Sequence, residues 1–287
     1  MNAIRLSLVA AIVALGLLAP QAVAITGGQV DEENTYSNVG AVVVIHSPFP
    51  EDQVPYVGAT GTLIHPRVLL TAGHVTALME SVWAQGIGSP NDIRVSFGVN
   101  ALDPKTWLEI EDAIAHPDYL ANPAGTIAND VGVMILKKPV NTRKISLAKL
   151  PYPGFLDDLK AAGMLRESGE GGTPLIQVGY GSTLDWPPPT IFPADGLRRF
   201  VYSDYLALAT GWLYTLQNLA TGNGGVGYGD SGGPTFWVGD DGTLVVLAVT
   251  GHGDPNRVAM SVDWRVDIPE TLDFIDDIIA MVDAGLL

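Results

Sequence analysis

The sequence predicts an all-β protein that ends in an α-helix. Short runs rich in β-branched and other apolar residues recur along the chain, and each has the length of a strand with turn-forming residues at its ends. The 33 glycines and 20 prolines favour short strands joined by tight turns. The clearest strand-like runs are Ala41–Ile45, Arg67–Leu70, Val131–Leu136, Leu175–Val178 and Leu244–Val249.

The helix is expected over residues 269–284. Apolar residues in this segment recur at the spacing of one helix face, and acidic residues occupy other positions. No basic residues accompany the apolar stripe, so packing against the core is a better interpretation than binding to a membrane surface. The stripe consists of Leu272, Ile275, Ile278, Ile279 and Val282.

Residues 1–24 have the composition of a secretory signal peptide. Arg5 is the only charged residue before Asp31, and Leu6–Leu18 is almost wholly apolar. A small-x-small cleavage pattern follows at Ala22-Val23-Ala24. We therefore expect cleavage after Ala24 and a secreted protein, either extracellular or periplasmic, with a retained membrane anchor as the alternative.

The composition also restricts the partners. The formal net charge is −16, and it becomes −17 if Arg5 leaves with the signal peptide. Such a surface repels phosphate backbones, which argues against nucleic-acid binding, and it favours the approach of basic substrates. The chain has no cysteine, so it is not a disulfide-stapled scaffold. No metal or cofactor is expected; Glu109, Glu111 and Asp112 could line a calcium-binding loop, but a solvated turn is the simpler interpretation.

Three motifs supply a histidine, an aspartate and a serine, in that order along the chain. His74 ends the run Leu70-Thr71-Ala72-Gly73-His74, Asp130 follows an asparagine, and Ser231 lies in Gly229-Asp230-Ser231-Gly232-Gly233-Pro234. A serine hydroxyl is a weak nucleophile, so a base must take its proton during attack on a carbonyl. Imidazole can do this, and a buried carboxylate would hold the imidazole in one tautomer. Glycines beside Ser231 would let the amides of Gly229 and Ser231 point at a developing oxyanion.

These runs resemble the trypsin-like serine peptidases of the chymotrypsin fold, family S1. Further similar runs are His116-Pro117-Asp118-Tyr119, Gly179-Tyr180-Gly181 and Trp264-Arg265-Val266. Two departures are visible, since this family more often has alanine at the position of Gly73 and commonly has a cysteine at the position of Val75.

The resemblance implies two six-stranded antiparallel β-barrels followed by the C-terminal α-helix. The first barrel would span about residues 25–138 and carry His74 and Asp130. A connector over 139–153 would lead to the second barrel, about 154–268, which would carry Ser231. The implied activity is that of a secreted, monomeric serine endopeptidase that cuts protein or peptide substrates through an acyl-enzyme. No stable membrane association is expected once the signal peptide is removed.

The resemblance also implies a mode of activation. Cleavage after Ala24 would expose Ile25-Thr26-Gly27-Gly28, which resembles the mature Ile-Val-Gly-Gly terminus of this family. The new α-amino group of Ile25 would pair with Asp230 and organise the oxyanion hole. Signal cleavage would then make the active enzyme directly, without a zymogen stage. The alternative is that Ile25 begins an ordinary edge strand.

The resemblance gives a less definite answer on substrate preference. The floor of the primary specificity pocket would be Gly225, which carries no charge and so argues against the usual preference for lysine or arginine. Asp263 could supply a negative charge from another wall or make a buried hydrogen bond. Thr250 and His252 would belong to the remaining wall, and His252 could bind an acidic side chain. An uncharged or medium-sized apolar preference is expected.

Two other functions remain open at this point. The first is a non-catalytic binding protein on a peptidase scaffold. The second is an esterase of the α/β-hydrolase class, because the residues around Ser231 also fit G-x-S-x-G. That class needs a histidine after the serine and a helix directly after the turn, whereas Pro234 and two glycines follow here.

Overall fold

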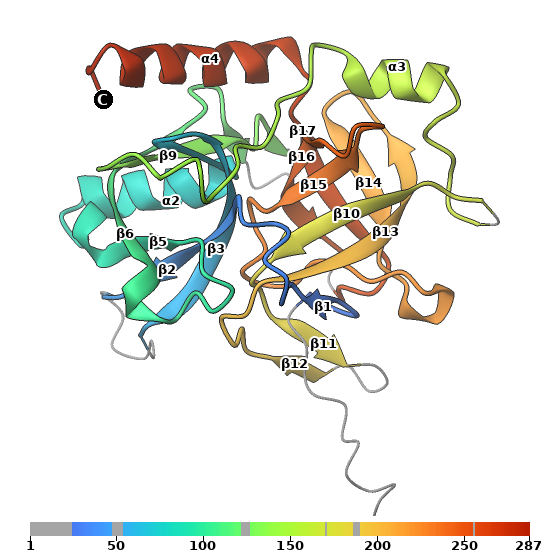
Figure 1. Cartoon of the computed structure of the whole chain (residues 1–287), viewed down its shortest axis with the longest axis horizontal. Helices are drawn as coiled ribbons and strands as arrows, with labels where there is room; N and C mark the ends of the chain where they lie inside the picture. The colour runs from blue at the N-terminus through green and yellow to red at the C-terminus, as the bar shows by residue number, and fades with distance from the viewer. Residues whose placement is uncertain (1–24, 48–53, 122–126, 170, 186–189, 255) are drawn as a thin grey trace, which may run out of the picture.

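Two antiparallel β-barrels lie side by side and form most of the molecule (Figure 1). The fold class predicted from the sequence is thus confirmed. The expected signal peptide lies outside the described residues. The computed structural model describes residues 25–47, 54–121, 127–169, 171–185, 190–254 and 256–287.

The first barrel closes through six strands in the order β2-β3-β4-β9-β6-β5. Its interior holds apolar side chains almost throughout, including Leu63, Leu69, Ile110 and Met134, which are all fully buried. Burial of such side chains supplies the main driving force for closing the sheet. The strands are Val39–Val44 (β2), Tyr56–His65 (β3), Val68–Thr71 (β4), Ile93–Ser96 (β5), Trp107–Ala115 (β6) and Gly132–Leu136 (β9).

The second barrel also closes through six strands, in the order β13-β10-β15-β16-β17-β14, because β14 pairs with β13. The short strand β1 (Gln29–Val30) adds to its edge by pairing with β13. The barrel strands are Pro174–Gly179 (β10), Arg199–Leu208 (β13), Trp212–Leu216 (β14), Pro234–Val238 (β15), Leu244–Gly253 (β16) and Met260–Arg265 (β17).

In the part of the chain that the structure describes, three α-helices lie outside the barrels. The expected C-terminal helix is present as α4 (Pro269–Asp283), and its apolar face joins a core cluster that both barrels share. Helices α2 (Gly73–Ala84) and α3 (Phe155–Ala161) were not anticipated as definite helices. The apolar residues of α2 at 75, 78, 79, 82 and 83 do have the spacing of one helix face, although Leu78 is 65% exposed in the structure.

The remaining elements are short. Two small hairpins pair β7 (Leu120–Ala121) with β8 (Ile127–Ala128), and β11 (Thr183–Asp185) with β12 (Thr190–Phe192). Three single-turn 3-10 helices cover Pro90–Asp92 (η1), Pro104–Thr106 (η2) and Leu219–Thr221 (η3). Within the described ranges, none of the helices has the length and apolar character needed to cross a membrane.

The first barrel meets the second through buried polar groups as well as apolar ones. Arg198, just before β13, is fully buried and donates hydrogen bonds to the carbonyls of Val39 and Phe97 in the first barrel. Its Nε lies 2.8 Å from the carboxylate of Asp31, which is also buried. The hydroxyl of Tyr180 donates to the same Val39 carbonyl. These contacts hold the barrels in one relative position.

Candidate active site

His74, which is half-buried, pairs with the buried Asp130 on the first barrel. His74 is the second residue of α2, which follows β4 directly, and its Nδ1 lies 3.0 Å from Asp130 Oδ2. The backbone N–H of His74 also donates to Asp130 Oδ1 at 2.8 Å. Asp130 is 1% exposed, whereas the His74 side chain is 34% exposed. The carboxylate therefore fixes both the ring and the backbone of His74 while the other ring edge faces outward.

Close packing explains the glycine before His74. A Cβ built on Gly73 would lie 2.9 Å from both the nitrogen and the oxygen of Val131. The start of α2 thus presses against the turn that carries Asp130. The backbone of Asn129 in that turn has a φ of 49°, which aspartate and asparagine tolerate better than most residues.

The Ser231 loop rests on the first barrel close to His74. The carbonyl of Ser231 accepts a hydrogen bond from Thr60 N–H at 2.9 Å. Gly232, with a φ of 81°, packs so tightly that a built Cβ would lie 2.0 Å from Thr71 Oγ1 and 2.6 Å from Ala72 N. Since Ala72 stands two residues before His74, this contact brings the serine to the same end of the barrels as the His74–Asp130 pair.

Ser231 and His74 are not joined by a hydrogen bond in this structure. Considering the described residues, neither the Ser231 hydroxyl nor His74 Nε2 takes part in one. Catalytic hydrogen bonds are often loose in a free enzyme and tighten when substrate binds. The structure therefore brings all three side chains to one end of the barrels but pairs only two of them directly.

The backbone around Ser231 offers two free donors. Gly229 has a φ of 98°, and its carbonyl accepts a hydrogen bond from Thr60 Oγ1 at 2.9 Å. This hydrogen bond fixes the peptide plane between Gly229 and Asp230. In the described part of the chain, the N–H groups of Gly229 and Ser231 donate no hydrogen bond.

Asp230 is a fully buried carboxylate enclosed by backbone. It accepts hydrogen bonds at 2.7 Å from the N–H groups of Gly181 and Gly227. Burial raises the pKa of Asp230 to about 7, against the opposing effect of these hydrogen bonds and of the Arg257 charge. A Cβ built on Gly179 or Gly181 would lie within 2.6 Å of this carboxylate, which explains the two glycines of the run that resembles a family motif.

Ile25 lies next to the segment that binds Asp230. Thr26 and Gly225 exchange two backbone hydrogen bonds, each of 2.9 Å, in an antiparallel bridge. This register puts Ile25, which is fully buried with a φ of 53°, beside the residues leading to Gly227. In this chain Ile25 follows Ala24, so its nitrogen belongs to a peptide bond and forms no ion pair with Asp230.

The residues expected around the specificity pocket occupy different environments. Thr250 and His252 lie on β16, and the His252 ring makes an edge contact with Trp212 at a centroid distance of 5.2 Å. Burial is the main cause that lowers the pKa of His252. Gly225 faces the side chain of Gln217, which the sequence interpretation did not single out.

Asp263 points into the interior of the second barrel. It accepts hydrogen bonds from Thr235 Oγ1 at 2.7 Å, Ser261 Oγ at 2.5 Å and Gln177 Nε2 at 3.1 Å. Burial raises the pKa of Asp263 to about 6, although these three hydrogen bonds oppose the shift. The Asp263 carboxylate is thus hydrogen-bonded to side chains of the second barrel.

The acidic residues considered for calcium lie on β6. Glu109 pairs with Lys137 at 3.7 Å, and Glu111 forms an ion pair with Arg67. Among the residues with described positions, no three metal-ligating side chains converge on one point.

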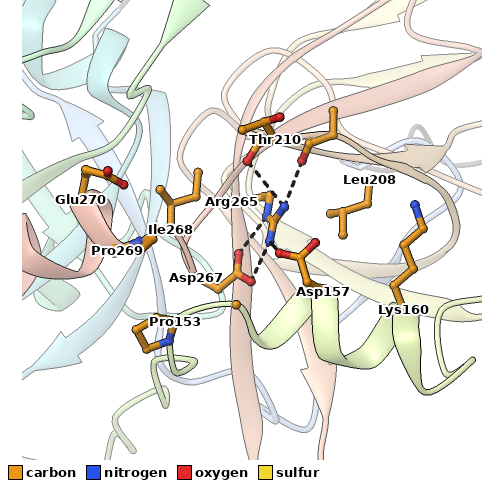
Figure 2. A pocket seen from close by; sticks show the side chains of 12 residues that line it. Pro153, Asp157, Lys160, Leu208, Thr210, Arg265, Asp267, Ile268, Pro269 and Glu270 are labelled. Carbon is orange, nitrogen blue, oxygen red and sulfur yellow. Dashed lines mark hydrogen bonds and ion pairs between the residues drawn. The ribbon is translucent and has the colours of Figure 1, made fainter.

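A separate cavity of about 820 Å³ lies where α3, β17 and the start of α4 meet (Figure 2). Arg265 crosses it and pairs with Asp157 at 2.6 Å and with Asp267 at 2.9 Å. Its remaining N–H groups donate to the carbonyls of Ala209 and Thr210. All nitrogens of the Arg265 guanidinium therefore make hydrogen bonds or ion pairs within the protein. None of the residues of the candidate site lines this cavity.

The fold and site define a two-barrel protein of the chymotrypsin type in which a histidine pairs with a buried aspartate beside a glycine-flanked serine. A comparison with protein families agrees, since the model of the trypsin family matches residues 25–180, which is more than half of the sequence. The chain belongs to the trypsin family.

The chain is also similar to the inactive CLIP domain-containing serine protease A8 of Anopheles gambiae. The two chains are 34% identical over 119 residues, which is 39% of this chain and 30% of that protein. The match therefore spans less than a third of the relative's length.

Proposed function

We propose that this protein is a secreted serine endopeptidase. The observation that carries the proposal is the pairing of His74 with the buried Asp130, with Nδ1 3.0 Å from the carboxylate, on the segment against which the Ser231 loop packs. One side chain for each catalytic role is thus available at the junction of the barrels.

In the proposed first step, Ser231 Oγ attacks the carbonyl carbon of the peptide bond while His74 Nε2 takes the hydroxyl proton. Asp130 keeps the neutral ring in the tautomer with a proton on Nδ1 and stabilises the imidazolium that forms. Because the carboxylate also binds the His74 N–H, the ring has little freedom to turn away.

The tetrahedral intermediate would place its oxyanion between the N–H groups of Gly229 and Ser231, which have no other acceptor in the described part of the chain. Its collapse breaks the C–N bond, and the imidazolium gives its proton to the leaving amine. Water then attacks the acyl-enzyme with His74 as base, which releases the acid and restores Ser231. Removal of one oxyanion donor typically costs about a hundredfold to a thousandfold in rate.

The proposal includes maturation by signal cleavage, which would convert the Ile25 nitrogen into an ammonium. The position of Thr26 opposite Gly225 supports this, because it keeps Ile25 beside the segment that contacts Asp230. An ion pair with Asp230 would lower the pKa of that carboxyl from the value of about 7 that burial imposes. The proposal also keeps the remaining expectations from the sequence, namely a monomer with protein or peptide substrates.

The proposed activity is tested with protein that begins at Ile25 and with a matched Ser231→Ala variant. Both are incubated with casein, and the cut sites are read by mass spectrometry. We expect cleavage by the first protein and a loss of about a millionfold in the variant. Equal cleavage by both would contradict the proposed role of Ser231.

The activation step is tested by adding one glycine before Ile25. Asp230 would then stay buried without its ammonium partner, a cost of several kcal/mol, so we expect activity to fall about a hundredfold or more. Circular dichroism of the same sample shows whether the fold is retained. Full activity in a folded sample would contradict the proposed activation by the Ile25 ammonium.

A non-catalytic binding role is the second candidate, favoured by one observation: Ser231 and His74 are not hydrogen-bonded in the free protein. A relative that covers part of this chain also has a name that calls it inactive. Fluorophosphonate labelling separates the two functions, since only an activated Ser231 reacts rapidly. The esterase of the α/β-hydrolase class is excluded, because the chain folds as two barrels and strand β15, not a helix, follows the serine.

A further inference from the structure

Gln217 fills the space that the sequence analysis assigned to the residue at position 225. It follows β14 directly, is 1% exposed, and its backbone N–H donates to the carbonyl of Ala259 at 2.9 Å. A Cβ built on Gly225 would lie only 2.1 Å from Gln217 Cγ and 2.2 Å from its Nε2. Position 225 needs a glycine because the side chain of Gln217 occupies the volume that a Cβ would fill.

The orientation of the Gln217 amide is set by one hydrogen bond. Its Nε2 donates to the carbonyl of Val226 at 3.1 Å. A carbonyl can only accept, so the nitrogen must face Val226 and the oxygen must face away. Oε1 lies 3.5 Å from a Cβ built on Gly253, at the end of β16. The oxygen therefore sits between the Gly225 segment and the strand that carries Thr250 and His252.

Gln217 Oε1 is an unsatisfied acceptor. It is fully buried and, among the described residues, accepts no hydrogen bond. Most buried side-chain polar atoms in proteins have a partner, and an exception needs an explanation. The oxygen is closed to solvent in this structure and lies between the two segments to which the sequence analysis assigned the walls of the pocket.

The other polar groups nearby do not provide the same function. Asp263 already accepts three hydrogen bonds within the barrel. Arg257 lies close to Gly253, with its Cδ 3.6 Å from the built Cβ, and its guanidinium lies over the Tyr228 ring at 4.4 Å. Arg257 would attract a carboxylate, but the lone pairs of Gln217 Oε1 would repel the same group.

We propose that Gln217 forms the floor of the primary specificity pocket, and that this short, neutral floor selects a side chain that donates a hydrogen bond. The proposal rests on the proposed peptidase function and names its substrate class: peptides with a short, uncharged donor such as threonine or asparagine before the cut. The length limit follows from the volume that Gln217 removes at Gly225. The need for a donor follows from the buried acceptor, because a shape-matched apolar side chain leaves that acceptor unpaired.

The test uses peptides that differ only in the residue before the cut, chosen as shape-matched pairs. Threonine against valine and asparagine against leucine measure the effect of the donor, while asparagine against aspartate measures the effect of charge. Hydrolysis is followed as kcat/KM with protein that begins at Ile25. Binding of the same peptides to a Ser231→Ala background is followed by calorimetry, which does not depend on turnover.

We expect a preference of about tenfold for threonine over valine and for asparagine over leucine in both measurements. Gln217→Met keeps the length of the side chain and removes the acceptor, so the preference should fall to near unity while long side chains stay excluded. Gln217→Glu places an acid at the floor and should shift the preference toward lysine. Gln85→Ala, at the exposed C-cap of α2, is the matched control and should leave every ratio unchanged.

Equal values within the first two pairs, ratios unchanged by Gln217→Met, or a preference for aspartate over asparagine would each overturn the proposal. The last result would assign recognition to Arg257 instead. If the active protein hydrolyses none of the peptides, the proposed function fails, yet the binding ratios still decide the role of Gln217. If none of the peptides binds to the Ser231→Ala protein, the proposed specificity pocket is wrong.

Discussion

The two barrels have the same number of strands and differ in what fills them. The interior of the first is apolar, with Leu63, Leu69, Ile110 and Met134 all fully buried. In the second, Leu175 on β10 packs in an apolar cluster, but Gln177, two residues further on the same face of that strand, belongs to a polar network. One end of the second barrel is therefore apolar and the other is polar.

The network joins four strands of the second barrel through a single carboxylate. Ser203 Oγ donates to Gln177 Oε1 at 2.9 Å, and the amide of Gln177 donates in turn to Asp263. Thr235 and Ser261 donate to the same Asp263. All five side chains are fully buried. Hydrogen bonds have stricter geometry than apolar contacts, so this end of the barrel is held in one arrangement.

The contrast matches the different tasks proposed for the two barrels. The first must hold one histidine and one aspartate, and a well-packed apolar barrel with backbone hydrogen bonds to Asp130 suffices. The second must hold β16 and β17, which lie beside the proposed pocket, as well as the loop with Ser231. The polar network fixes β17 relative to β10, β13 and β15, and β16 is held by its backbone pairing with β15 and β17.

The largest effect is expected where the two barrels meet. Arg198→Met removes the partner of buried Asp31 and three hydrogen bonds to the first barrel and Tyr180, so it should lower the free energy of unfolding by about 3–5 kcal/mol. Urea denaturation measures the change. Replacing Asp31 by leucine in the same protein removes the unpaired charge and should recover part of the loss. A single variant as stable as the wild type would show that the barrels do not depend on this connection.

A second, smaller effect concerns how the free energy of unfolding depends on pH through Asp263 in the second barrel. The pKa of Asp263 is about 6 in the folded protein and about 4 in the unfolded chain, so the native state holds this proton more tightly. Its contribution to stability is fully present below pH 4 and is lost as the pH rises through 6, by roughly 3 kcal/mol at most.

Asp263→Asn should abolish this dependence. The difference in unfolding free energy between variant and wild type should therefore shift in favour of the variant from pH 4 to pH 7, and urea denaturation across that range measures it. The other carboxylates, including Asp230, titrate in both proteins and cancel in the difference. A difference that stays constant with pH would mean that Asp263 is ionised throughout and that the network holds a charge.

Much of this architecture could be predicted from the sequence. The five strand-like runs all fall in barrel strands, and the period of apolar residues in α4 is visible without a structure. The motif residues His74, Asp130 and Ser231 could be singled out because each lies in a run with several constrained neighbours. Helix α2 was missed, although its apolar residues at 75, 78, 79, 82 and 83 have the spacing of one helix face.

Long-range polar pairs were also beyond the reach of the sequence. Asp31 and Arg198 are separated by most of the chain, and neither lies in a recognisable motif. Gln217 gave one weak signal, because Leu213, Thr215 and Gln217 alternate as inward-facing positions at the end of a strand. An amide at such a position indicates a buried hydrogen-bonding role. The partner, Val226, becomes evident only when the chain folds.

The smallest predicted effect gives the sharpest form of the comparison, because it uses the same substitution in each barrel. Thr235 in the second barrel donates to Asp263 at 2.7 Å, whereas Thr62 Oγ1 in the first is buried and, within the described residues, has no partner. Valine has nearly the shape of threonine. Thr235→Val should therefore cost about 1.5–3 kcal/mol, while Thr62→Val should be neutral or stabilise the protein by about 1 kcal/mol.

Thermal and urea unfolding of both variants measure these changes, and Thr215→Val separates two explanations. Thr215 belongs to the second barrel, but among the described side chains its hydroxyl also has no partner. If the hydrogen-bond partner decides the outcome, Thr215→Val should behave like Thr62→Val. If Thr215→Val instead costs as much as Thr235→Val, the polar end of the second barrel would depend on hydroxyl groups beyond the network around Asp263, and the difference between the barrels would be wider than the five linked side chains indicate.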